Sequence, residues 1–331
     1  MKKALVLGGG GFIGSHLAKR LKSEGHFVRI SDIKEKPDYF DVKEICDEYI
    51  CADLRHQADM TLSMFGPNQH SLNDSEESFD EVYNLAADMG GAGYIFSGEN
   101  DFQVMSNSAK ININAANIAS RFNVKRLFFS SSACIYPEYN QLDPNSPNTK
   151  EDSAYPANPD SDYGWEKLFS ERIYFAAHRN TGLEVRVARY HNVYGPQSSW
   201  NDGKEKAPAA LCRKVAENDR QIEIWGDGKQ TRSFLYIEDA LDATIKFMRQ
   251  DKFIGPVNIG SEEMVTINGL AKAVMAVAGK ELKIKHIDGP LGVRGRSSDN
   301  ELITSIIDWE PKYRLIDGLK PTYEWIKKQV C

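Results

Sequence analysis

A glycine-rich turn near the N-terminus limits the folds available to this chain more than any other feature. An apolar segment, residues 3–7, is followed by Gly8-Gly9-Gly10-Gly11-Phe12-Ile13-Gly14 and then by an amphipathic stretch, residues 15–22. A strand, a glycine turn and a helix in this order open a doubly wound parallel sheet that binds dinucleotides. The glycines permit a tight turn, and the pyrophosphate then lies on the helix N-terminus. The residues expected to contact the dinucleotide here are Gly8, Gly11, Phe12, Ile13 and Gly14.

Three further strand ends add to this cofactor site. The second predicted strand ends in Asp32, whose carboxylate can accept hydrogen bonds from a ribose 2′-hydroxyl and would repel a 2′-phosphate. The expected cofactor is therefore NAD rather than NADP. Asp53 and Leu54 follow the third predicted strand, where Asp53 either meets the adenine or caps the next turn. Ala86 follows the fourth and is small enough for the cofactor to approach the backbone.

The composition excludes several other classes of protein. The net charge of -6 argues against a nucleic-acid binder. No apolar run reaches the roughly 20 residues of a membrane span. The five cysteines are scattered and lack the spacing of metal ligands. We therefore expect no bound metal, reduced thiols and a cytoplasmic location.

Hydroxyl groups and one thiol follow the fifth predicted strand. The largely apolar residues 124–129 lead into Ser130-Ser131-Ser132-Ala133-Cys134, and ligands bind at the carboxyl ends of strands in such sheets. Tyr163 and Lys167 lie one helical turn apart on one face. We expect Lys167 to lower the pKa of the Tyr163 phenol, which can then take a proton from a substrate alcohol. The alternative role for Cys134 is that of a small buried filler.

Beyond residue 188 the strands become shorter and the order of elements changes. We expect residues 1–188 to form an NAD-binding domain, with a return segment near 233–256, and residues 189–331 to form mainly the substrate domain. The expected fold class is α/β, a Rossmann-type doubly wound parallel sheet with a smaller α/β C-terminal substrate domain.

Two polar loops stand out among the connections. Residues 66–80 predict a surface loop without an assigned function. In residues 292–296, glycines separate Arg294 from Arg296. Such a loop suits phosphate binding, and the alternative is a solvated pair of arginines.

The glycine turn, Asp32, Asn84-Leu85-Ala86-Ala87, the serines and the Tyr163/Lys167 pair together resemble the extended short-chain dehydrogenase/reductase superfamily. Members of that superfamily act mainly on nucleotide sugars, which they bind on a smaller C-terminal domain. Within it, five segments resemble the GDP-mannose 3,5-epimerase family. They are residues 86–91, 131–138, 205–210, 225–234 and 292–296.

This resemblance implies an isomerase that epimerises GDP-D-mannose at C3 and C5 to GDP-L-galactose, with GDP-L-gulose as a partial product. NAD would oxidise C4 and later re-reduce it. Ser132, Tyr163 and Lys167 match the redox residues of the family, and Cys134 and Lys206 match its acid/base pair. Without the resemblance, Lys206 would be interpreted as a surface lysine at a helix start. The implied substrate contacts are Gly90, Gly91, Ser132, Ala133, Cys134, Asn192, Glu205, Lys206, Ala207, Lys214, Gln230, Thr231, Arg232 and Arg294.

The resemblance also implies a homodimer formed through helices near residues 104–121 and 163–178. Other functions stay open at this point. A C4 epimerase would use the same redox residues but needs no thiol base. A 4,6-dehydratase usually has an Asp-Glu pair where Ala133 and Cys134 stand. An epimerase-reductase would prefer NADPH, which Asp32 disfavours, and a non-catalytic NAD-binding sensor would not need an intact redox set.

Overall fold

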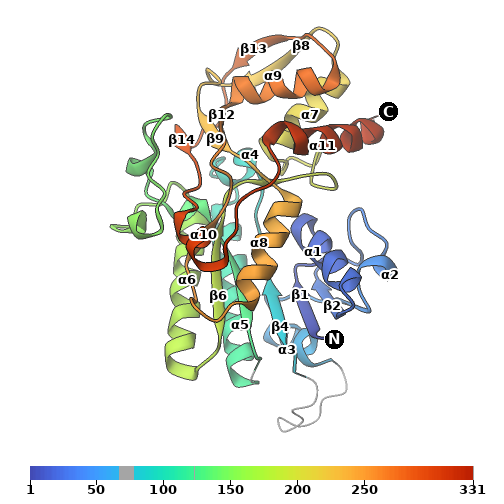
Figure 1. Cartoon of the computed structure of the whole chain (residues 1–331), viewed down its shortest axis with the longest axis vertical. Coiled ribbons are helices and arrows are strands. Elements are labelled where there is room, and N and C mark those ends of the chain that lie inside the picture. Colours follow the sequence, from blue (N-terminus) through green and yellow to red (C-terminus); the bar gives the residue numbers. More distant parts are fainter. Residues whose placement is uncertain (67–77, 123, 331) are drawn as a thin grey trace.

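A seven-stranded parallel sheet is the framework of this computed structural model, which describes residues 1–66, 78–122 and 124–330 (Figure 1). The strands follow the order β11-β6-β5-β4-β1-β2-β3, and every neighbouring pair is parallel. The direction of winding reverses between β1 and β4, where ligands bind in doubly wound sheets. The expected α/β fold class is thus confirmed. The strands are β1 (Lys3–Leu7), β2 (Phe27–Asp32), β3 (Glu48–Cys51), β4 (Glu81–Asn84), β5 (Leu127–Ser132), β6 (Val185–Tyr190) and β11 (Val257–Ile259).

Helices cover both faces of this sheet because successive residues of a strand point to opposite sides. In β1, Ala4 and Val6 pack into one apolar core, whereas Leu5 and Leu7 pack into another. Helices α1 and α8 cover the first face, and α3, α5 and α6 cover the second. Apart from the edge strand β3, the strands are therefore buried along most of their length, as expected for a parallel sheet covered on both faces. The helices are α1 (Phe12–Ser23), α3 (Gln57–Phe65), α5 (Asp101–Arg121), α6 (Asp162–Thr181) and α8 (Ile237–Arg249).

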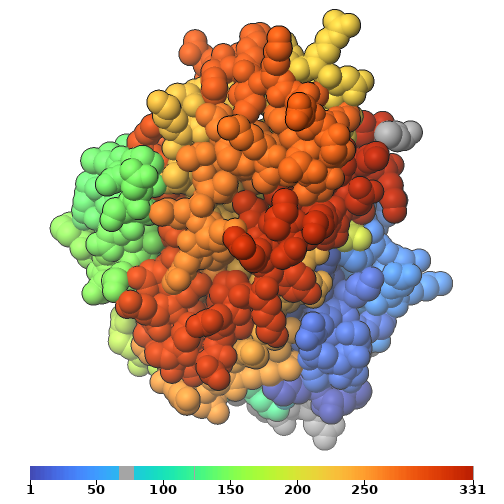
Figure 2. Space-filling view, turned by 45° about the horizontal axis from the view of Figure 1, so that its top comes forward, coloured from blue at the N-terminus to red at the C-terminus, as the bar shows by residue number. Residues whose placement is uncertain are grey.

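The C-terminal half builds a smaller lobe above the sheet in the view of Figure 1. Its helices α7, α9 and α11 pack on one another, beside a two-stranded sheet and a three-stranded sheet. Figure 2 shows residues of this half, in orange and red, spreading over one face, with the N-terminal residues in blue at its flank. The elements are α7 (Ala207–Glu217), β8 (Gln221–Trp225), β9 (Thr231–Ser233), β12 (Met264–Thr266), α9 (Ile267–Ala278), β13 (Lys283–Ile287), β14 (Gly295–Arg296) and α11 (Leu315–Val330).

Short elements complete the connections between these parts. β7 and β10 form a two-stranded parallel sheet between the large sheet and the small lobe. The remaining elements are α2 (Val42–Ile45), α4 (Ala92–Ile95), β7 (Val193–Tyr194), β10 (Leu235–Tyr236) and α10 (Glu301–Ile307), with 3₁₀ turns at Ala133–Ile135, Glu138–Gln141 and Glu151–Ala154.

β5 ends three residues later than the expected strand at 124–129, so the serines belong to the strand. Ser130 to Ser132 pair with residues of β6. Small hydroxyl side chains fit this buried position because each can find an acceptor: Ser130 Oγ donates to the Asn84 carbonyl at 3.1 Å and Ser131 Oγ to Glu171 Oε1 at 2.5 Å.

Residues 231–236 form two short strands, β9 and β10, which lie in separate sheets, and α8 begins at Ile237. Residues 67–77 of the predicted surface loop, and Cys331, lie outside the described residues.

Within residues 1–66, 78–122 and 124–330, no helix is both long and apolar enough to cross a bilayer. The same residues contain no group of three or more His, Cys, Asp or Glu side chains arranged for a metal ion.

His16 on α1 gives the fold a measurable pH dependence. Its ring lies edge-on to Phe12 and Phe40, with centroid distances of 5.3 and 5.0 Å, and its Nε2 lies 3.1 Å from the carbonyl oxygen of Pro196. Burial lowers the pKa of this imidazole to about 4, although the Pro196 carbonyl acts in the opposite direction. The pKa of a histidine in the unfolded chain is about 6.5. The neutral, buried His16 therefore makes its full contribution to the free energy of unfolding above pH 6.5, and this contribution is lost as the pH falls toward 4.

We expect the His16→Gln variant to lose less stability than the wild type between pH 7 and pH 5. At pH 5 the unfolded wild type binds a proton that the folded protein excludes, which costs about 2 kcal/mol of unfolding free energy. The glutamine variant has no such group. Urea denaturation at the two pH values measures the difference, and equal losses in both proteins would show that another group is responsible.

Candidate active site

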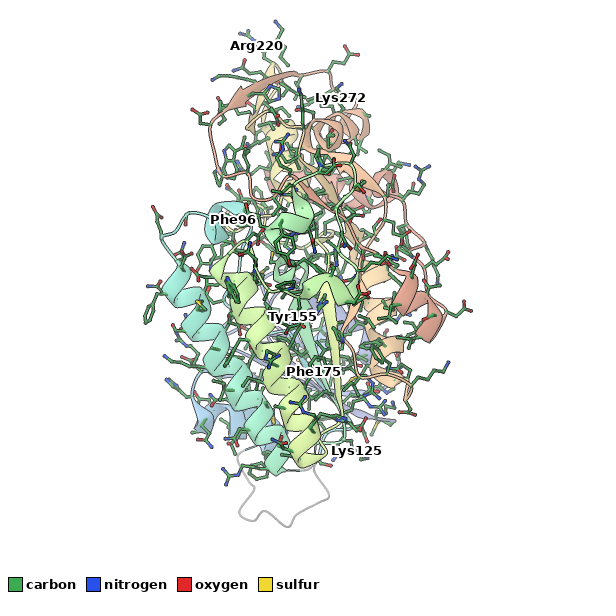
Figure 3. The ribbon with its side chains drawn as sticks, turned by 90° about the vertical axis from the view of Figure 1, so that its left-hand side faces the viewer. Phe96, Lys125, Tyr155, Phe175, Arg220 and Lys272 are labelled. Carbon is green, nitrogen blue, oxygen red and sulfur yellow. The ribbon has the colours of Figure 1, made fainter. Side chains whose placement is uncertain are left out.

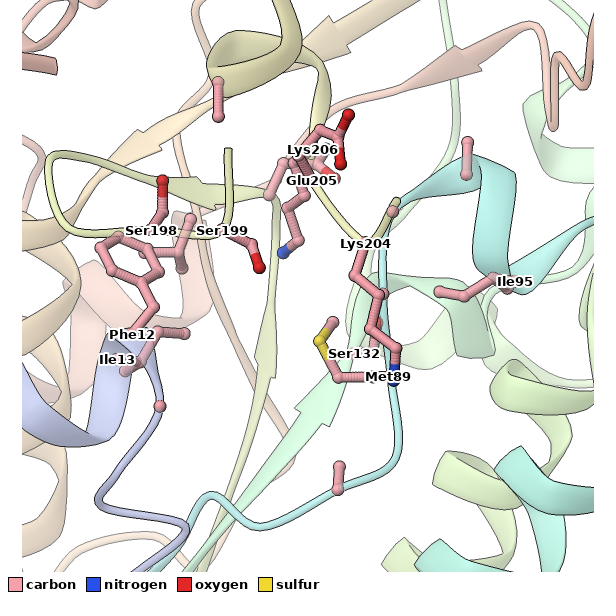
Figure 4. Close-up of a pocket in the computed structure, with 18 of the residues that line it drawn as sticks. Phe12, Ile13, Met89, Ile95, Ser132, Ser198, Ser199, Lys204, Glu205 and Lys206 are labelled. Atoms are coloured by element: carbon pink, nitrogen blue, oxygen red, sulfur yellow. The ribbon is translucent and has the colours of Figure 1, made fainter. Parts of the chain in front are cut away.

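A cavity of about 980 Å³ lies where the carboxyl ends of the parallel strands meet the smaller lobe. Figure 4 shows Phe12 and Ile13 at the start of α1, Ser132 at the end of β5, and Lys206 entering from the opposite side. The lining includes all but two of the residues that the sequence marks for cofactor or substrate binding. The two outside it are Thr231 and Arg294.

Other partners hold these two side chains away from the cavity. The Thr231 hydroxyl donates to the carbonyl oxygen of Pro144. The Arg294 guanidinium forms an exposed ion pair with Asp227, with N–O distances of 3.3 Å. Arg296, two residues later, lines the cavity instead.

The turn between β1 and α1 fits the diphosphate of a dinucleotide. Gly8 has a φ of +79°, and a Cβ on Gly14 would lie 2.3 Å from the Gly8 carbonyl oxygen. A Cβ on Gly11 would meet nothing closer than 3.7 Å, so this glycine leaves space toward the cavity. No side chain of the described residues caps α1 at Gly11. The N–H groups of Phe12 and Ile13 can therefore receive an anion at the positive end of the helix dipole.

Two carboxylates stand at the ends of β2 and β3. Asp32 accepts hydrogen bonds from the backbone N–H groups of Gly10 at 2.8 Å and Lys34 at 3.0 Å, which fix it beside the turn. Its remaining lone pairs can accept ribose hydroxyls. Asp53 accepts the Arg55 guanidinium at 2.6 Å, and the same hydrogen-bonded side chain is the main cause of its lowered pKa. Asp53 also accepts the Arg55 N–H, so it caps a turn and lines the cavity at once.

Ser132, Tyr163 and Lys167 meet at the end of β5. The Lys167 ammonium donates to the Ser130 carbonyl at 2.8 Å and lies 5.7 Å from the centroid of the Tyr163 ring. Burial raises the pKa of the Tyr163 phenol, the nearby Cys134 adds to this effect, and a hydrogen bond with Ser132 opposes it. The direction is opposite to the lowering expected from Lys167, because a buried phenolate loses more hydration than its neighbours return.

Arg296, which the sequence marks only as part of a possible phosphate-binding loop, is buried and contacts the Cys134 thiol instead. Arg296 donates from Nη1 to Cys134 Sγ at 3.1 Å, from Nη2 to Asp160 at 2.9 Å and from Nε to Gln141 at 2.5 Å. The side chains of Arg296 and Asp160 are only 6% and 5% exposed. The ion pair with Asp160 therefore fixes a positive charge beside the sulfur.

In the sequence, only the glycine spacing of residues 292–296 indicates a functional position for Arg296. A Cβ on Gly295 would lie 2.5 Å from the carbonyl oxygen of Asp143, so the backbone of β14 lies against the loop at Asp143 without an intervening side chain. This close approach gives Arg296 its reach to Cys134.

Lys206 lies on the opposite wall, at the N-cap of α7. Its ammonium has no hydrogen-bond partner among the described residues. Burial lowers the pKa of this ammonium, and the nearby Cys134 acts in the opposite direction. A lowered pKa makes a lysine a better proton donor near neutral pH.

The part of the cavity formed by the smaller lobe holds further buried polar groups. Burial lowers the pKa of Lys214, and burial followed by repulsion from Arg296 lowers that of Arg232 to about 10. Gln230 Oε1 and Glu205 Oε2 are buried without a hydrogen-bond partner among the described residues. Such atoms are usually satisfied by water or a ligand, and the neighbouring cations suit an anionic group such as a diphosphate.

Comparisons with known proteins show which family the chain resembles. A family model described as "NAD dependent epimerase/dehydratase family" matches residues 4–260. GDP-mannose 3,5-epimerase from Arabidopsis thaliana is 44% identical over 328 residues, which cover 99% of this chain and 83% of the relative. GDP-mannose 3,5-epimerase 1 from Oryza sativa subsp. indica is 46% identical over 325 residues, with coverages of 98% and 82%.

Solved structures agree over almost the whole chain. UDP-glucose 4-epimerase from Thermotoga maritima, solved with UDP-glucose, superposes with a TM-score of 0.83 at 25% identity and covers 99% of this chain and 100% of its own. UDP-glucuronic acid 4-epimerase from Bacillus cereus, solved with UDP-glucuronic acid and NAD, gives 0.80 at 26% identity, with 99% coverage of both chains.

We expect Arg296→Met to lower the free energy of unfolding by about 3 kcal/mol, because it leaves the Asp160 carboxylate buried without its cation. The double variant Arg296→Met/Asp160→Asn should regain at least about 1 kcal/mol of this loss. Arg294→Met removes an exposed ion pair, which water screens, and should cost much less stability. Urea denaturation measures all three, and equal losses in the single and double Arg296 variants would contradict this account of the pair.

Proposed function

The chain belongs to the NAD-dependent epimerase/dehydratase family, and from this premise we propose that it is an isomerase that inverts C3 and C5 of GDP-D-mannose. The product is GDP-L-galactose, and inversion at C5 alone gives GDP-L-gulose. The two relatives at 44% and 46% identity support this substrate. The buried cations and the unpartnered Gln230 and Glu205 oxygens support a site for a polar, anionic sugar nucleotide.

The observation that carries the proposal is the placement of Cys134 and Lys206. One follows β5 of the large sheet and the other begins α7 of the smaller lobe, and both line the cavity that holds Tyr163. Inversion at C3 or C5, next to a C4 ketone, requires removal of a proton on one face and delivery of a proton on the other. Two proton-transfer groups on separate walls of the cavity meet this requirement. A C4 epimerase needs no such pair, because it moves only a hydride at C4.

Each group then has a defined task. When bound, NAD⁺ supplies a hydride acceptor for C4 and afterwards the donor that re-reduces it. Tyr163 takes the proton of the C4 hydroxyl, and Ser132 donates a hydrogen bond to the C4 oxygen. The positive charge of Lys167 stabilises the phenolate of Tyr163. The C4 ketone makes the hydrogens on C3 and C5 acidic. Cys134, beside the Arg296 guanidinium, removes such a proton, and Lys206 delivers one to the opposite face.

A division of labour between the two parts of the chain follows from this assignment. We infer that residues 1–188, with the return segment near 233–256, hold the cofactor, and that residues 189–331 mainly hold the sugar nucleotide. The pairing of β11 with β6 and the packing of α8 on α1 support a return of the chain to the cofactor-binding sheet. The free thiols Cys46, Cys51, Cys134 and Cys212 support a reducing compartment such as the cytoplasm.

We expect the NAD-loaded protein to place deuterium at both C3 and C5 of the product when it turns over GDP-D-mannose in D₂O. Each inversion replaces a ring hydrogen by one from the solvent-exchanged proton donor. Mass spectrometry and NMR of the recovered nucleotide sugar identify the labelled carbons and the configuration. A C4 epimer without ring deuterium would replace the proposal by a 4-epimerase, and no reaction at all with a competent NAD-loaded protein would reject it.

Two variants separate the redox step from proton transfer. We expect Cys134→Ala to slow deuterium incorporation by at least about 100-fold while reduced nicotinamide still forms, because only the base is lost. Tyr163→Phe should suppress both signals, since C4 is no longer oxidised. Loss of both signals in Cys134→Ala would show that Cys134 is not a dedicated proton-transfer group.

We also propose that the protein is a homodimer formed through the outer faces of α5 and α6. Figure 3 shows these two long helices running side by side along one flank. The large apolar side chains Phe102, Ile113, Trp165 and Phe169 are between 42% and 77% exposed on them. Large exposed apolar side chains on two adjacent helices are typical of an interface, and a two-fold axis would cover them with the same helices of a second copy.

We expect the wild type to sediment as a dimer and the double variant Trp165→Glu/Phe169→Glu as a monomer, because the new carboxylates would be buried without partners. Met264→Glu, at an exposed apolar residue of β12 in the smaller lobe, is the matched control and should remain a dimer. Analytical ultracentrifugation distinguishes the two states. A monomeric wild type at micromolar concentration would reject this interface.

A further inference from the structure

Lys204 connects the smaller lobe to the loop that follows β4. Its ammonium lies 3.5 Å from Oδ1 of Asp88 and 4.0 Å from the centroid of the Tyr94 ring. The Tyr94 hydroxyl donates to the same Asp88 oxygen at 2.9 Å. Lys204 lines the cavity, as Figure 4 shows. One cation therefore engages a carboxylate and an aromatic face that are already bonded to each other.

The backbones of the two segments also touch. The N–H of Gly91 donates to the Lys204 carbonyl at 2.8 Å, and a Cβ on Gly91 would lie 2.2 Å from the carbonyl oxygen of Glu205. No side chain could stand between the two segments at this point. Lys206 is the next residue of the chain, so its place on the cavity wall depends on this contact.

Asp88 is a fixed anchor for Lys204. Its Oδ2 accepts a hydrogen bond from Asn107 Nδ2 at 2.9 Å. The Asn107 Oδ1 in turn accepts a hydrogen bond from Arg55 Nη1 at 3.0 Å. Burial would raise the pKa of Asp88, but hydrogen bonds from Asn107 and Tyr94 and the charge of Lys204 hold it below its usual value. The carboxylate is therefore ionised at neutral pH and is supported from the side of the cofactor-binding sheet.

We propose that Lys204 is a positioning residue whose bonds to Asp88 and Tyr94 hold Lys206 on the wall facing Cys134. The inference rests on the proposed function, in which Cys134 removes a ring proton and Lys206 delivers one to the opposite face. When Lys206 is displaced, the carbanion next to the C4 ketone takes its proton back from the Cys134 thiol. The C–H bond then re-forms on its original face, with a hydrogen that the thiol has exchanged with solvent.

The partition between exchange and inversion tests this role in D₂O. Lys204→Met keeps the aliphatic stem and removes the charge. We expect its ratio of deuterated GDP-mannose of unchanged configuration to inverted product to rise by about 10-fold or more. The amount of reduced nicotinamide should change less than about twofold, because Tyr163 and Lys167 are not disturbed. Lys204→Arg keeps the cation and should restore the wild-type ratio.

Lys125→Met is the matched control, because it removes an ion pair with Asp80 at the opposite end of the large sheet (Figure 3). It should show the wild-type ratio. An unchanged ratio in Lys204→Met would overturn the inference.

Amide hydrogen exchange tests the positioning independently of the chemistry. In Lys204→Met and in Asp88→Asn, a substitution that preserves side-chain size, we expect the amides of residues 88–96 and 204–210 to exchange about 10-fold faster. Lys204→Arg should exchange as the wild type does. If the wild-type protein places no deuterium on the sugar ring, the proposed function is rejected. The amide exchange rates would still test whether Lys204 positions residues 204–210. Unchanged exchange rates in Lys204→Met would overturn the positioning role itself.

Discussion

The first turn of α6 rests directly on the 3₁₀ turn that carries Cys134, and the candidate site depends on this contact. A Cβ on Gly164 would lie 2.1 Å from the carbonyl oxygen of Cys134. Tyr163 precedes Gly164, and Ser132 accepts the N–H of Cys134 at 3.2 Å. The relative positions of the phenol, the hydroxyl and the thiol are thus set by two backbones in contact. Functional groups held in this way need less reorganisation than groups on long flexible side chains.

The parts of the fold and site that neighbouring residues build were accessible from the sequence. The apolar strands and the glycine turn predict the doubly wound sheet because their spacing along the chain is also their spacing in the fold. Gly8 and Gly14 meet across one turn, and Tyr163 and Lys167 share one helical face for the same reason. The end of β5 was less accessible, because only the pairing with β6 keeps its three serines in the strand.

Contacts between distant segments could not be predicted from local pattern. Arg294 and Arg296 stand in the same glycine-spaced motif, yet Asp227 holds one at the surface and Asp160 draws the other to Cys134. The direction of the Tyr163 pKa was missed because burial is a property of the assembled fold, whereas the nearby lysine is visible in the sequence. The link from Lys204 to Asp88 likewise exists only once the two lobes meet.

The buried cations of the smaller lobe link charge recognition to proton uptake. Lys206, Lys214 and Arg232 all have lowered pKa values because burial removes water from their charged forms. An anionic diphosphate among them would favour the charged forms again and raise these values. Where a group is partly neutral beforehand, binding of the nucleotide sugar then draws a proton from solution. Affinity increases as the pH falls through that range, and the buffer contributes to the heat of association.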